Sequence, residues 1–434
     1  MAAGSRIPVA VLGAGLTGLS AAQTLRKQGV MCRVFERSAR VGGLAVTDEE
    51  AGYRFDRTGH LLHLRSDALR AEVLDWLDGD CLTIQRRSRV WSHGVHTRYP
   101  FQANTFGLPP HVAYECVKGF VDAASSKSAR APQNFEEYCL QHFGAGISRH
   151  FMLPYNARLW GVPAREITAA WCERFVPRPT LEDVIAGAVG LNDRELGYNA
   201  EFVYPRRGIG ALSEALGRRS GPVELGRAPL RLESKTRSLV FENERVSYDV
   251  LVSSIPLPVL LDLFDDLPAS VRAARGALRA TSLYYLDVAL SAPAEKDFHW
   301  VYVPEERYPF YRVGCYSHFS PEMAPRGCAG LYVELVDRAP PDLPALAPRV
   351  VEGLREIGYV RRATDVAFLR PRKIDVAYVI HDHRHAGSLE VISRFLESEG
   401  VLSTGRYGGW NYSSMEDAIR FGRDAAECAM ERLR

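Results

Sequence analysis

Three glycines near the start of the chain constrain its fold more than any other feature. Gly13, Gly15 and Gly18 form G-x-G-x-x-G within PVAVLGAGLTGLSAAQTLRKQGVMCRVFE, residues 8–36. The apolar run before them predicts a short buried strand, and apolar residues at helical spacing follow them. A second predicted strand then ends at Glu36. This order of strand, glycine turn, helix, strand and acid is the dinucleotide-binding fingerprint of a Rossmann-like fold.

The glycines and the acid each have a physical role in holding a dinucleotide. Glycine lets the backbone turn tightly, and it lets backbone amides approach a pyrophosphate at the start of the helix, where the helix dipole favours anions. Glu36 is placed to accept a hydrogen bond from a ribose hydroxyl. The predicted cofactor-binding residues of this unit are Gly13, Gly15, Leu16, Thr17, Gly18, Glu36 and Arg37.

Length and composition limit the class of protein. A chain of 434 residues is too long for one hydrophobic core, so two or three sub-domains are expected. An apolar share of 46% and a charged share of 24% are ordinary for a soluble protein, and a net charge of +2 gives no reason to expect a nucleic-acid partner. The start does not read as a signal peptide, and no run of about 18 apolar residues occurs. We therefore expect a cytoplasmic protein with no membrane segment.

The residue types that most often bind metals form no metal-site pattern here. The eight cysteines are scattered without a C-x-x-C pair, which predicts reduced thiols rather than a disulfide frame or a zinc site. HDHRH, residues 381–385, concentrates three histidines in a polar stretch, but no distant ligands accompany them. We predict no metal site.

The middle of the chain alternates between helical and strand patterns. Residues 100–190 show helical spacing of apolar residues, whereas residues 228–256 alternate as strands. Four later segments predict an antiparallel sheet: 282–292, 299–305, 310–319 and 330–336. Residues 335–348, rich in proline, are predicted to be a loop.

Glycine motifs beyond the fingerprint resemble those of one flavoprotein superfamily. These are ERSARVGGLAVT, GYRFDRTGHLLH and, near the C-terminus, STGRYGGWNYSSMEDAIRF, in which Ser414 and Asp417 form a capping box. The pattern is similar to that of amine oxidases, protoporphyrinogen oxidases and UDP-galactopyranose mutases. The resemblance implies FAD, with the paired glycines against its pyrophosphate and the GH segment near its isoalloxazine. The further cofactor-binding residues that it implies are Gly42, Gly43, Leu44, Gly59, His60, Gly405, Arg406 and Met415.

Motifs in the middle of the chain narrow the resemblance. YPFQAN, PYNARLWGVP, CERFVPRP, YNAEFVYPRRG, WVYVPE and PFYRVGCYSHFSP occur in the order and near the spacing of UDP-galactopyranose mutases, in particular their eukaryotic-type branch. By this resemblance, Arg174 and Arg312 bind the nucleotide-sugar pyrophosphate, and His60 lies near the flavin as a third catalytic residue. The other implied substrate-binding residues are Tyr99, Gln102, Asn199, Trp300, Tyr302, Tyr378, Arg406 and Tyr412. For Trp300 and Tyr302, which share one strand face, core packing remains the alternative.

The resemblance also implies an architecture. The predicted fold is α/β, with a discontinuous Rossmann-like FAD-binding domain, a helical insertion and an antiparallel-sheet substrate domain. The predicted FAD-binding parts are residues 1–98, 193–268 and 371–434, the helical insertion is 99–192, and the substrate domain is 269–370.

The implied activity is interconversion of the pyranose and furanose forms of a nucleotide sugar. In that family N5 of the reduced FAD attacks the anomeric carbon, and NADH or NADPH is the expected reductant. No second dinucleotide motif is present for a nicotinamide cofactor. The partner is thus a nucleotide-sugar substrate, with no nucleic acid and no membrane, and the oligomeric state stays open.

Two departures from the family pattern are the reason to consider a second activity. Thr58 stands in RTGH where a glycine is expected, and PRRGIG differs from the usual P-A-R-G-G segment. The alternative is an FAD-dependent oxidoreductase of the amine oxidase or protoporphyrinogen oxidase type, which needs no pair of pyrophosphate arginines. A flavoprotein that only binds a partner is a third hypothesis.

Overall fold

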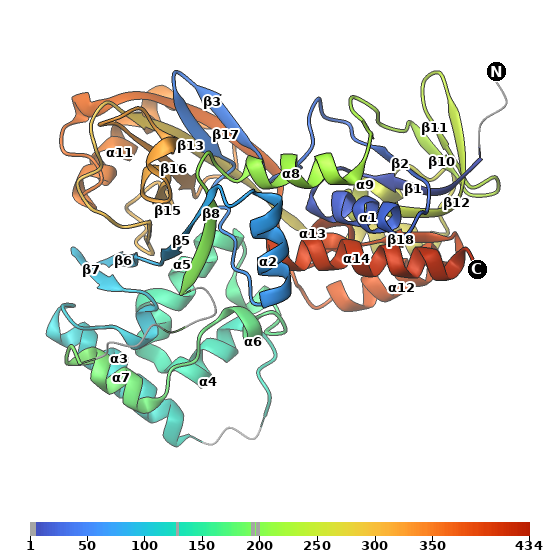
Figure 1. Ribbon diagram of the computed structural model, residues 1–434. Helices are drawn as coiled ribbons and strands as arrows, with labels where there is room; N and C mark the ends of the chain where they lie inside the picture. Colours follow the sequence, from blue (N-terminus) through green and yellow to red (C-terminus); the bar gives the residue numbers. More distant parts are fainter. Residues whose placement is uncertain (1–5, 127–129, 192–195, 197–199) are drawn as a thin grey trace.

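A mixed sheet carries the glycine turn (Figure 1). The computed structural model describes residues 6–126, 130–191, 196 and 200–434. The strand order is β10 (Arg231–Glu233), β11 (Ser238–Val240), β12 (Arg245–Ser253), β1 (Arg6–Leu12), β2 (Cys32–Phe35) and β9 (Val223–Glu224), and β18 (Val401–Ser403) also pairs with β12. β1 lies parallel to both β12 and β2, so the predicted strand–helix–strand unit is confirmed.

Helices cover both faces of this first sheet, because its central strands are buried on both sides. On one face α1 (Leu16–Lys27) packs against α8 (Gly210–Ser220) and α14 (Met415–Arg432), with α2 (Asp67–Trp76) beside α8. On the other face lie α9 (Leu257–Leu261), α10 (Ala269–Ala277) and α12 (His385–Ser398). Because α14 comes from the C-terminus and α1 from the N-terminus, the Rossmann-like domain is discontinuous, as predicted.

The second sheet is long and mostly antiparallel. Its order is β17 (Val366–Val379), β13 (Ala280–Leu290), β16 (Ala329–Leu335), β15 (Phe310–Cys315), β14 (Trp300–Tyr302), β6 (Ser88–Ser92) and β7 (Val95–Arg98). Only the pairing of β14 with β6 is parallel among these strands. One face packs on α11 (Leu343–Glu356), and the other faces the helical insertion.

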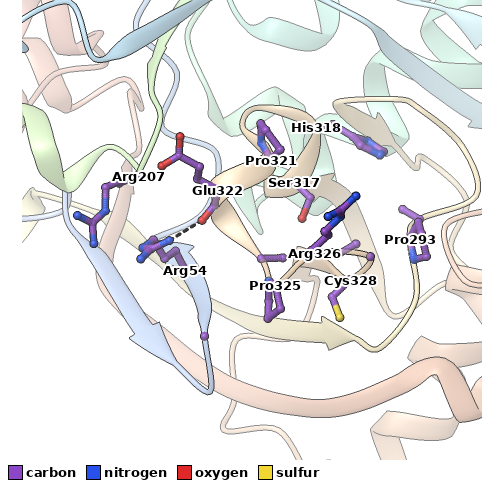
Figure 2. A pocket seen from close by; sticks show the side chains of 15 residues that line it. Arg54, Arg207, Pro293, Ser317, His318, Pro321, Glu322, Pro325, Arg326 and Cys328 are labelled. Carbon is purple, nitrogen blue, oxygen red and sulfur yellow. Dashed lines mark hydrogen bonds between the residues drawn. The ribbon is translucent and has the colours of Figure 1, made fainter.

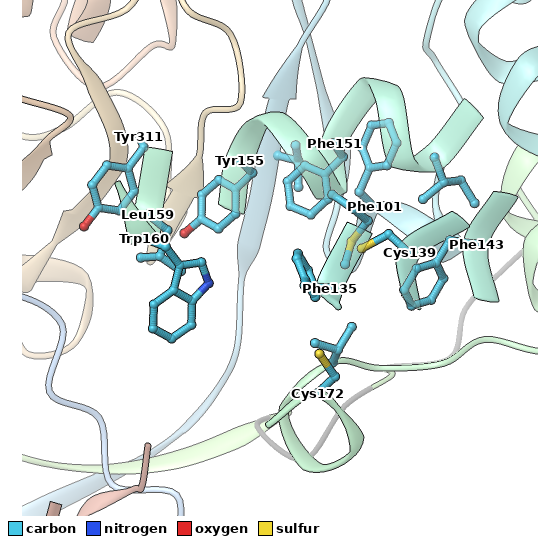
Figure 3. Close-up of a cluster of buried hydrophobic side chains, with 14 of the residues drawn as sticks. Phe101, Phe135, Cys139, Phe143, Phe151, Tyr155, Leu159, Trp160, Cys172 and Tyr311 are labelled. Atoms are coloured by element: carbon cyan, nitrogen blue, oxygen red, sulfur yellow. The ribbon is translucent and has the colours of Figure 1, made fainter. Parts of the chain in front are cut away.

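The insertion is built around buried aromatic rings. Its helices are α3 (Pro110–Ser125), α4 (Phe135–Ile147), α5 (Leu153–Trp160), α6 (Cys172–Phe175) and α7 (Leu181–Ala188), with short turns η1 (Phe101–Ala103), η2 (Ser148–Met152) and η3 (Ala164–Glu166). The rings of Phe101 and Phe151 stack with centroids 5.1 Å apart. Figure 3 shows how this core continues through Tyr155 and Trp160 toward Tyr311 of the second sheet. Buried apolar contacts therefore join the insertion to the sheet.

Short elements join these larger parts. β3 (Thr47–Glu50) pairs with β4 (Tyr53–Asp56), and β5 (Cys81–Gln85) pairs with β8 (Glu201–Pro205). The remaining turns are η4 (Tyr316–His318), η5 (Pro321–Met323), η6 (Ala363–Asp365) and α13 (Gly405–Gly408). None of the helices in the described ranges is both long and apolar enough to cross a lipid bilayer.

The observed elements differ from the expectations in two places. The limits predicted at residues 98 and 370 do not follow the sheets, because β6 and β7 pair into the second sheet and β17 runs through residue 370. The predicted loop at residues 335–348 was also wrong in part, because α11 begins at Leu343. Pro344 stands in its first turn, where no intrahelical amide bond is lost.

Candidate active site

The glycine turn leaves the start of α1 open. Gly15 is the N-cap residue, no side chain caps it, and the first turn has no acid. A Cβ atom on Gly18 would lie 1.8 Å from the carbonyl oxygen of Gly13, so only glycine fits there. The Glu36 carboxylate accepts hydrogen bonds from the amides of Ala14 and Ser38, each at 2.8 Å, which places it beside the turn. This arrangement fits the pyrophosphate and ribose of a dinucleotide cofactor.

The second glycine pair packs directly on this turn. The Gly42 amide donates to the Ala14 carbonyl at 2.7 Å. A Cβ atom on Gly43 would lie 3.3 Å from Cα of Gly15. Leu44, the next residue, is half-buried and packs against the aromatic core of the insertion. The paired glycines thus lie between the cofactor turn and that core.

The segment Thr58–Gly59–His60 is tightly held. Thr58 is buried and has a φ of +66°, a left-handed conformation that favours glycine. A Cβ atom on Gly59 would lie 2.5 Å from the Tyr332 hydroxyl oxygen. The Tyr316 hydroxyl donates to the Asp56 carbonyl at 2.6 Å, just before the segment. Position 58, where the family pattern has glycine, therefore has a left-handed backbone conformation typical of glycine, although the residue is threonine.

His60 is an uncharged imidazole at neutral pH. Burial, together with the positive charges of Arg406 and Arg312, lowers its pKa to about 4. Its Nδ1 atom is buried and has no hydrogen-bond partner within 3.5 Å in the described structure. The imidazole and the two arginines are thus close enough to interact, and Nδ1 is left available for a ligand.

Arg312 is bound to a carboxylate that the sequence motifs did not reveal. It lies on β15 opposite Glu334 of β16, and its Nη2 atom lies 2.5 Å from Oε1 of Glu334. Glu334 is fully buried, and its Oε2 atom has no partner among the described residues. Burial alone would lower the pKa of Arg312, but Glu334 and nearby tyrosines raise it well above its ordinary value. The sequence signal for this pair was a single acid in the apolar strand GLYVELV.

Tyrosines link Arg312 to a second guanidinium, that of Arg406. Nη2 of Arg312 also donates to the Tyr378 hydroxyl at 3.2 Å, and the ring centroids of Tyr378 and Tyr412 are 6.3 Å apart. The guanidinium of Arg406 lies 4.8 Å from the Tyr412 centroid and 6.0 Å from the Tyr378 centroid. It donates hydrogen bonds to the carbonyls of Ser413 and Ala377, and no carboxylate of the described residues forms an ion pair with it.

Arg174 lies at the edge of this cluster and is held by another acid. Its Nη2 atom donates to Asp417 Oδ2 at 2.6 Å, and its side chain is 38% exposed. Asp417 and Ser414 form the predicted capping box at the start of α14. The guanidinium stacks on Phe175, whose ring lies 4.6 Å from that of Tyr412. The structure therefore connects Arg174 to the tyrosines through Phe175, whereas Arg312 contacts them directly.

The C-terminal glycine segment closes onto the cofactor turn. A Cβ atom on Gly405 would lie 2.6 Å from the Thr17 hydroxyl oxygen of α1. Met415, the first residue of α14, is half-buried beside the core shared with α1. Leu16 is buried in the same core, and Arg37 is exposed beyond Glu36. Residues predicted from opposite ends of the chain thus meet at one place.

The three aromatic residues that remain among the predicted substrate residues lie in two separate groups of rings. Tyr99 and Tyr302 pack with centroids 4.9 Å apart, and Tyr302 also contacts Tyr155. Trp300 instead packs with Phe202 and Phe319 in the neighbouring core.

Gln102 ties this region to the segment that follows Arg174. Its side-chain amide donates to the Pro177 carbonyl at 2.8 Å, and its Oε1 atom is buried without a partner in the described part of the chain. Asn199 lies outside the described residues.

A separate groove of about 770 Å³ opens on the outer surface (Figure 2). Its lining comes from the β3–β4 hairpin, the segment before α8, the loop after β13 and the connection from β15 to β16, and it includes Arg54, Arg207, His318 and Arg326. None of the residues predicted for the cofactor or the substrate lines it. We therefore do not assign the predicted chemistry to this groove.

Sequence comparisons match parts of the chain. The profile of the NAD(P)-binding Rossmann-like domain matches residues 11–77. A probable UDP-galactopyranose mutase of Klebsiella pneumoniae is 23% identical over 184 residues, which cover 40% of this chain and 46% of that protein. The pyridine nucleotide-disulfide oxidoreductase domain-containing protein 2 of Rattus norvegicus is 49% identical over 109 residues, 23% of this chain and 16% of that protein. The matches thus span less than half the length of these curated relatives.

Comparison of structures extends the similarity to nearly the whole chain. A crystal structure of reduced UDP-galactopyranose mutase superposes with a TM-score of 0.91 at 26% identity, covering 98% of this chain and 94% of that one. A putative protoporphyrinogen oxidase from Exiguobacterium sp. 255-15 superposes with a TM-score of 0.77 at 16% identity, covering 99% and 100%, which shows a shared fold. The chain therefore resembles the UDP-galactopyranose mutases in sequence and in fold, and it shares its fold with the putative protoporphyrinogen oxidase.

Proposed function

We propose that this chain binds FAD and interconverts the pyranose and furanose forms of a nucleotide sugar. The observation that carries the proposal is the convergence of Arg312, Arg406, Tyr378 and Tyr412 in one aromatic cluster near His60. The similarity to a reduced UDP-galactopyranose mutase over 98% of the chain supports it. Guanidinium groups and tyrosine hydroxyls together suit the oxygens of a diphosphate.

In this proposal Arg312 and Arg406 bind the diphosphate from two sides of Tyr378. Arg312 is held in place by buried Glu334 and keeps further donor positions, including a buried Nε without a partner in the described structure. Arg406 is oriented by two carbonyls and stacks on tyrosine rings. Fixed donors of this kind stabilise the charge that develops on a departing diphosphate, because they need no reorganisation during the reaction.

Arg174, which the resemblance predicts to bind the pyrophosphate together with Arg312, is in this proposal a third donor at the edge of the site. To reach a ligand it has to exchange its ion pair with Asp417, and its side chain is 38% exposed. The Asp417 carboxylate is only 8% exposed, but it also pairs with Arg65 and accepts hydrogen bonds from Ser414, so it keeps partners when Arg174 turns to a ligand.

The reaction divides work between cofactor and protein. When bound, reduced FAD supplies the nucleophile for the anomeric carbon of the sugar. The tyrosine and tryptophan rings around Arg312 exclude water, and the arginines and tyrosine hydroxyls retain the diphosphate until the sugar ring has closed again. Neutral His60 can exchange a hydrogen bond beside two guanidinium groups without adding a third positive charge.

Binding of UDP tests the diphosphate site directly. Trp160 lies with its ring 5.6 Å from Tyr378 and 5.8 Å from Tyr412, so tryptophan fluorescence reports on the cluster. We expect UDP to bind and uridine not to bind, and we expect Arg312→Ala to lower turnover about a hundredfold, as when one transition-state donor is lost. Arg326→Ala, in the outer groove, is the matched control and should leave both unchanged. Equal binding of uridine and UDP would contradict the proposal.

Thr58 is the observation that supports a second candidate function, that of an FAD-dependent oxidoreductase. It places a β-branched side chain, in a left-handed conformation, where the mutase pattern has glycine. An oxidoreductase passes electrons from substrate through FAD to an acceptor, whereas a mutase returns the flavin unchanged. The two are separated by measuring oxygen uptake together with the sugar product.

A further inference from the structure

Three histidines of the HDHRH segment, residues 381–385, lie between the proposed site and the first sheet. The segment follows β17, which carries Tyr378 near its end, and it leads into α12, which packs against the first sheet through Ile392 and Leu396. No cluster of histidine, cysteine or acidic side chains suited to a metal ion occurs among the described residues. Hydrogen bonds at both ends of the segment indicate a different role.

One end of the segment is bonded to the helical insertion. The His381 carbonyl accepts hydrogen bonds from the amide and the hydroxyl of Thr168, at 2.7 and 3.0 Å. Nη1 of Arg279 lies 3.0 Å from Oε2 of Glu166 and 3.6 Å from Oδ2 of Asp382, so a shared cation adds a second link. Thr168 and Glu166 both belong to the insertion, so these contacts fix the segment against it.

The other end of the segment is bonded to the loop that carries Arg406 and Tyr412. Nε2 of His385 lies 2.8 Å from the Trp410 carbonyl oxygen. A carbonyl only accepts, so Nε2 carries the proton and donates, in the neutral and in the charged imidazole alike. Trp410 is buried and has a φ of +48°, a left-handed conformation that is uncommon outside glycine. The hydrogen bond thus holds an unfavourable backbone conformation two residues before Tyr412.

Hydrogen bonds within the loop couple Trp410 to both proposed ligand-binding residues. The amide of Asn411, the next residue, donates to the Arg406 carbonyl at 2.9 Å. The Arg406 guanidinium donates to the Ser413 carbonyl at 2.6 Å, on the far side of Tyr412 in the chain. Arg406 and Tyr412 are therefore held in one bonded loop, and the Trp410 carbonyl is the point at which α12 holds that loop.

A second imidazole orients that of His385. The rings of His381 and His385 stack with centroids 4.3 Å apart and planes inclined by 28°. Burial, with smaller contributions from His385 and Arg406, lowers the pKa of His381 to about 4, so this ring is neutral at neutral pH and does not repel its neighbour. The backbone of His385 is fixed as well, because it is the first residue of α12. Both the ring and the backbone of His385 are thus held in place.

We propose that His385 is a positioning residue of the diphosphate site, a role that rests on the proposed function. Through the Trp410 carbonyl it fixes the loop that presents Arg406 and Tyr412, and it acts through that loop rather than on the ligand itself. A binding group that is already held in its bound position loses little freedom when the ligand arrives, so its anchor adds to affinity. Loss of the anchor should therefore weaken UDP binding while the fold stays intact.

Substitutions of His385 that differ in where they place a donor test this role. UDP affinity is measured by calorimetry on the full FAD-loaded chain. His385→Leu removes the donor, and we expect the dissociation constant of UDP to rise about tenfold, the effect of one lost hydrogen bond. His385→Gln places an amide near the position of Nε2 and should bind UDP as the wild type does. His383→Leu, at an exposed histidine of the same segment, is the matched control and should also leave the affinity unchanged.

A double variant shows whether the effect passes through Tyr412. Tyr412→Phe removes a proposed diphosphate donor, so it should weaken UDP binding by itself. If His385 acts by positioning that hydroxyl, His385→Leu has a smaller effect on UDP affinity in the Tyr412→Phe background than in the wild type, because the contributions of coupled residues are not additive. A residue that only stabilised the fold would change the affinity by the same factor in both backgrounds.

Three results would overturn this inference alone: UDP binding by His385→Leu as tight as by the wild type, binding by His385→Gln as weak as by His385→Leu, or equal effects of His385→Leu in the two backgrounds. A wild type that does not bind UDP would overturn the proposed function and this inference together. If His385→Leu lowers the melting temperature, His385→Asn replaces it, since its shorter side chain falls short of the Trp410 carbonyl, and the same loss of affinity is required.

Discussion

At the scale of single residues, Thr58 shows how a local rule is broken beside the proposed site. A left-handed backbone costs a non-glycine residue about 1–2 kcal/mol. Hydrogen bonds around the segment hold this conformation, from the Thr58 amide to the Asp56 carbonyl and from the His60 amide to the Thr58 carbonyl, each at 3.0 Å. The sequence identified the position from a motif, and the dihedral angle supplies the physical reason for glycine there.

Replacing Thr58 by glycine and by alanine separates backbone strain from side-chain loss. Both variants lose the same hydroxyl and methyl, but alanine keeps the left-handed strain. We expect Thr58→Gly to be more stable than Thr58→Ala by about 1 kcal/mol, after the larger chain entropy of unfolded glycine is allowed for. Urea unfolding of the two holoproteins measures the difference, and an alanine variant that is equally or more stable would refute the strain.

The Arg312–Glu334 pair makes a prediction about stability as well as about binding. Removing Arg312 leaves the fully buried Glu334 carboxylate without its partner. We expect Arg312→Ala to lower the free energy of unfolding by about 3 kcal/mol, because an unpaired buried charge is costly. The double variant Arg312→Ala, Glu334→Gln should recover most of that loss in urea unfolding, while UDP binding stays weak. If the double variant recovers no stability, the unpaired Glu334 carboxylate is not what destabilises Arg312→Ala.

Residues of the candidate site were predictable where a local motif carries them, and their partners were not. Arg312, Arg406 and Tyr412 lie in recognisable motifs, and the structure brings their side chains together with that of Tyr378. The contact of Glu334 with Arg312 depends on the register between two neighbouring strands. Asp417, the partner of Arg174, lies 243 residues away from it along the chain. Such pairings come from tertiary packing, which no local pattern encodes.

At the scale of elements, Asp56 joins four segments. Its carboxylate accepts hydrogen bonds from the Thr47 hydroxyl of β3 at 2.6 Å, the Tyr204 hydroxyl of β8 at 2.5 Å, and the Ile209 amide before α8 at 3.1 Å. Burial raises the pKa of Asp56 to about 7 despite these hydrogen bonds. The group therefore remains largely protonated in the folded protein over a range in which it ionises in the unfolded chain.

This shift predicts a pH-dependent effect of Asp56→Asn. Asp56 has a pKa of about 4 in the unfolded chain and about 7 in the folded protein. Between these two pH values the carboxyl ionises in the unfolded chain but stays largely protonated in the folded protein. The ionisation stabilises the unfolded state, so the stability of the wild type falls as pH rises from about 4 to about 7. Asparagine cannot ionise, and it can still accept from Thr47 and Ile209. We expect the stability of Asp56→Asn relative to the wild type to rise from pH 4 to pH 7 and then to level off, as measured by urea unfolding. A constant difference would contradict the raised pKa.

Secondary structure was most predictable where capping and periodicity agree. The helices at both ends of the chain, α1 and α14, follow from the glycine fingerprint and from the Ser414–Asp417 capping box. The start of α11 was missed because Pro344 and Pro348 read as loop residues, although Pro344 in the first turn costs no intrahelical hydrogen bond. The pairing of β6 with β14 joins segments about 210 residues apart, which alternation along one strand cannot reveal.

At the scale of the whole molecule, three parts of the chain meet at the proposed site. The cofactor turn, the second sheet and the insertion each bring residues to one aromatic cluster: Leu44 from behind the glycine turn, Tyr302 and Tyr311 from the sheet, and Tyr155 and Trp160 from the insertion. The fold alone is shared with the putative protoporphyrinogen oxidase. The reaction therefore has to be decided by the product, since the fold cannot decide it.

The central claim is tested by incubating the FAD-loaded protein with UDP-galactopyranose without oxygen, once with oxidised flavin and once after reduction with dithionite. Chromatography of the nucleotide sugars then measures the furanose product, and an oxygen electrode measures uptake in a parallel aerobic sample. We predict furanose only with the reduced flavin and no substrate-dependent oxygen uptake. Oxygen uptake with an oxidised product, and no furanose in either flavin state, would contradict the proposed isomerisation.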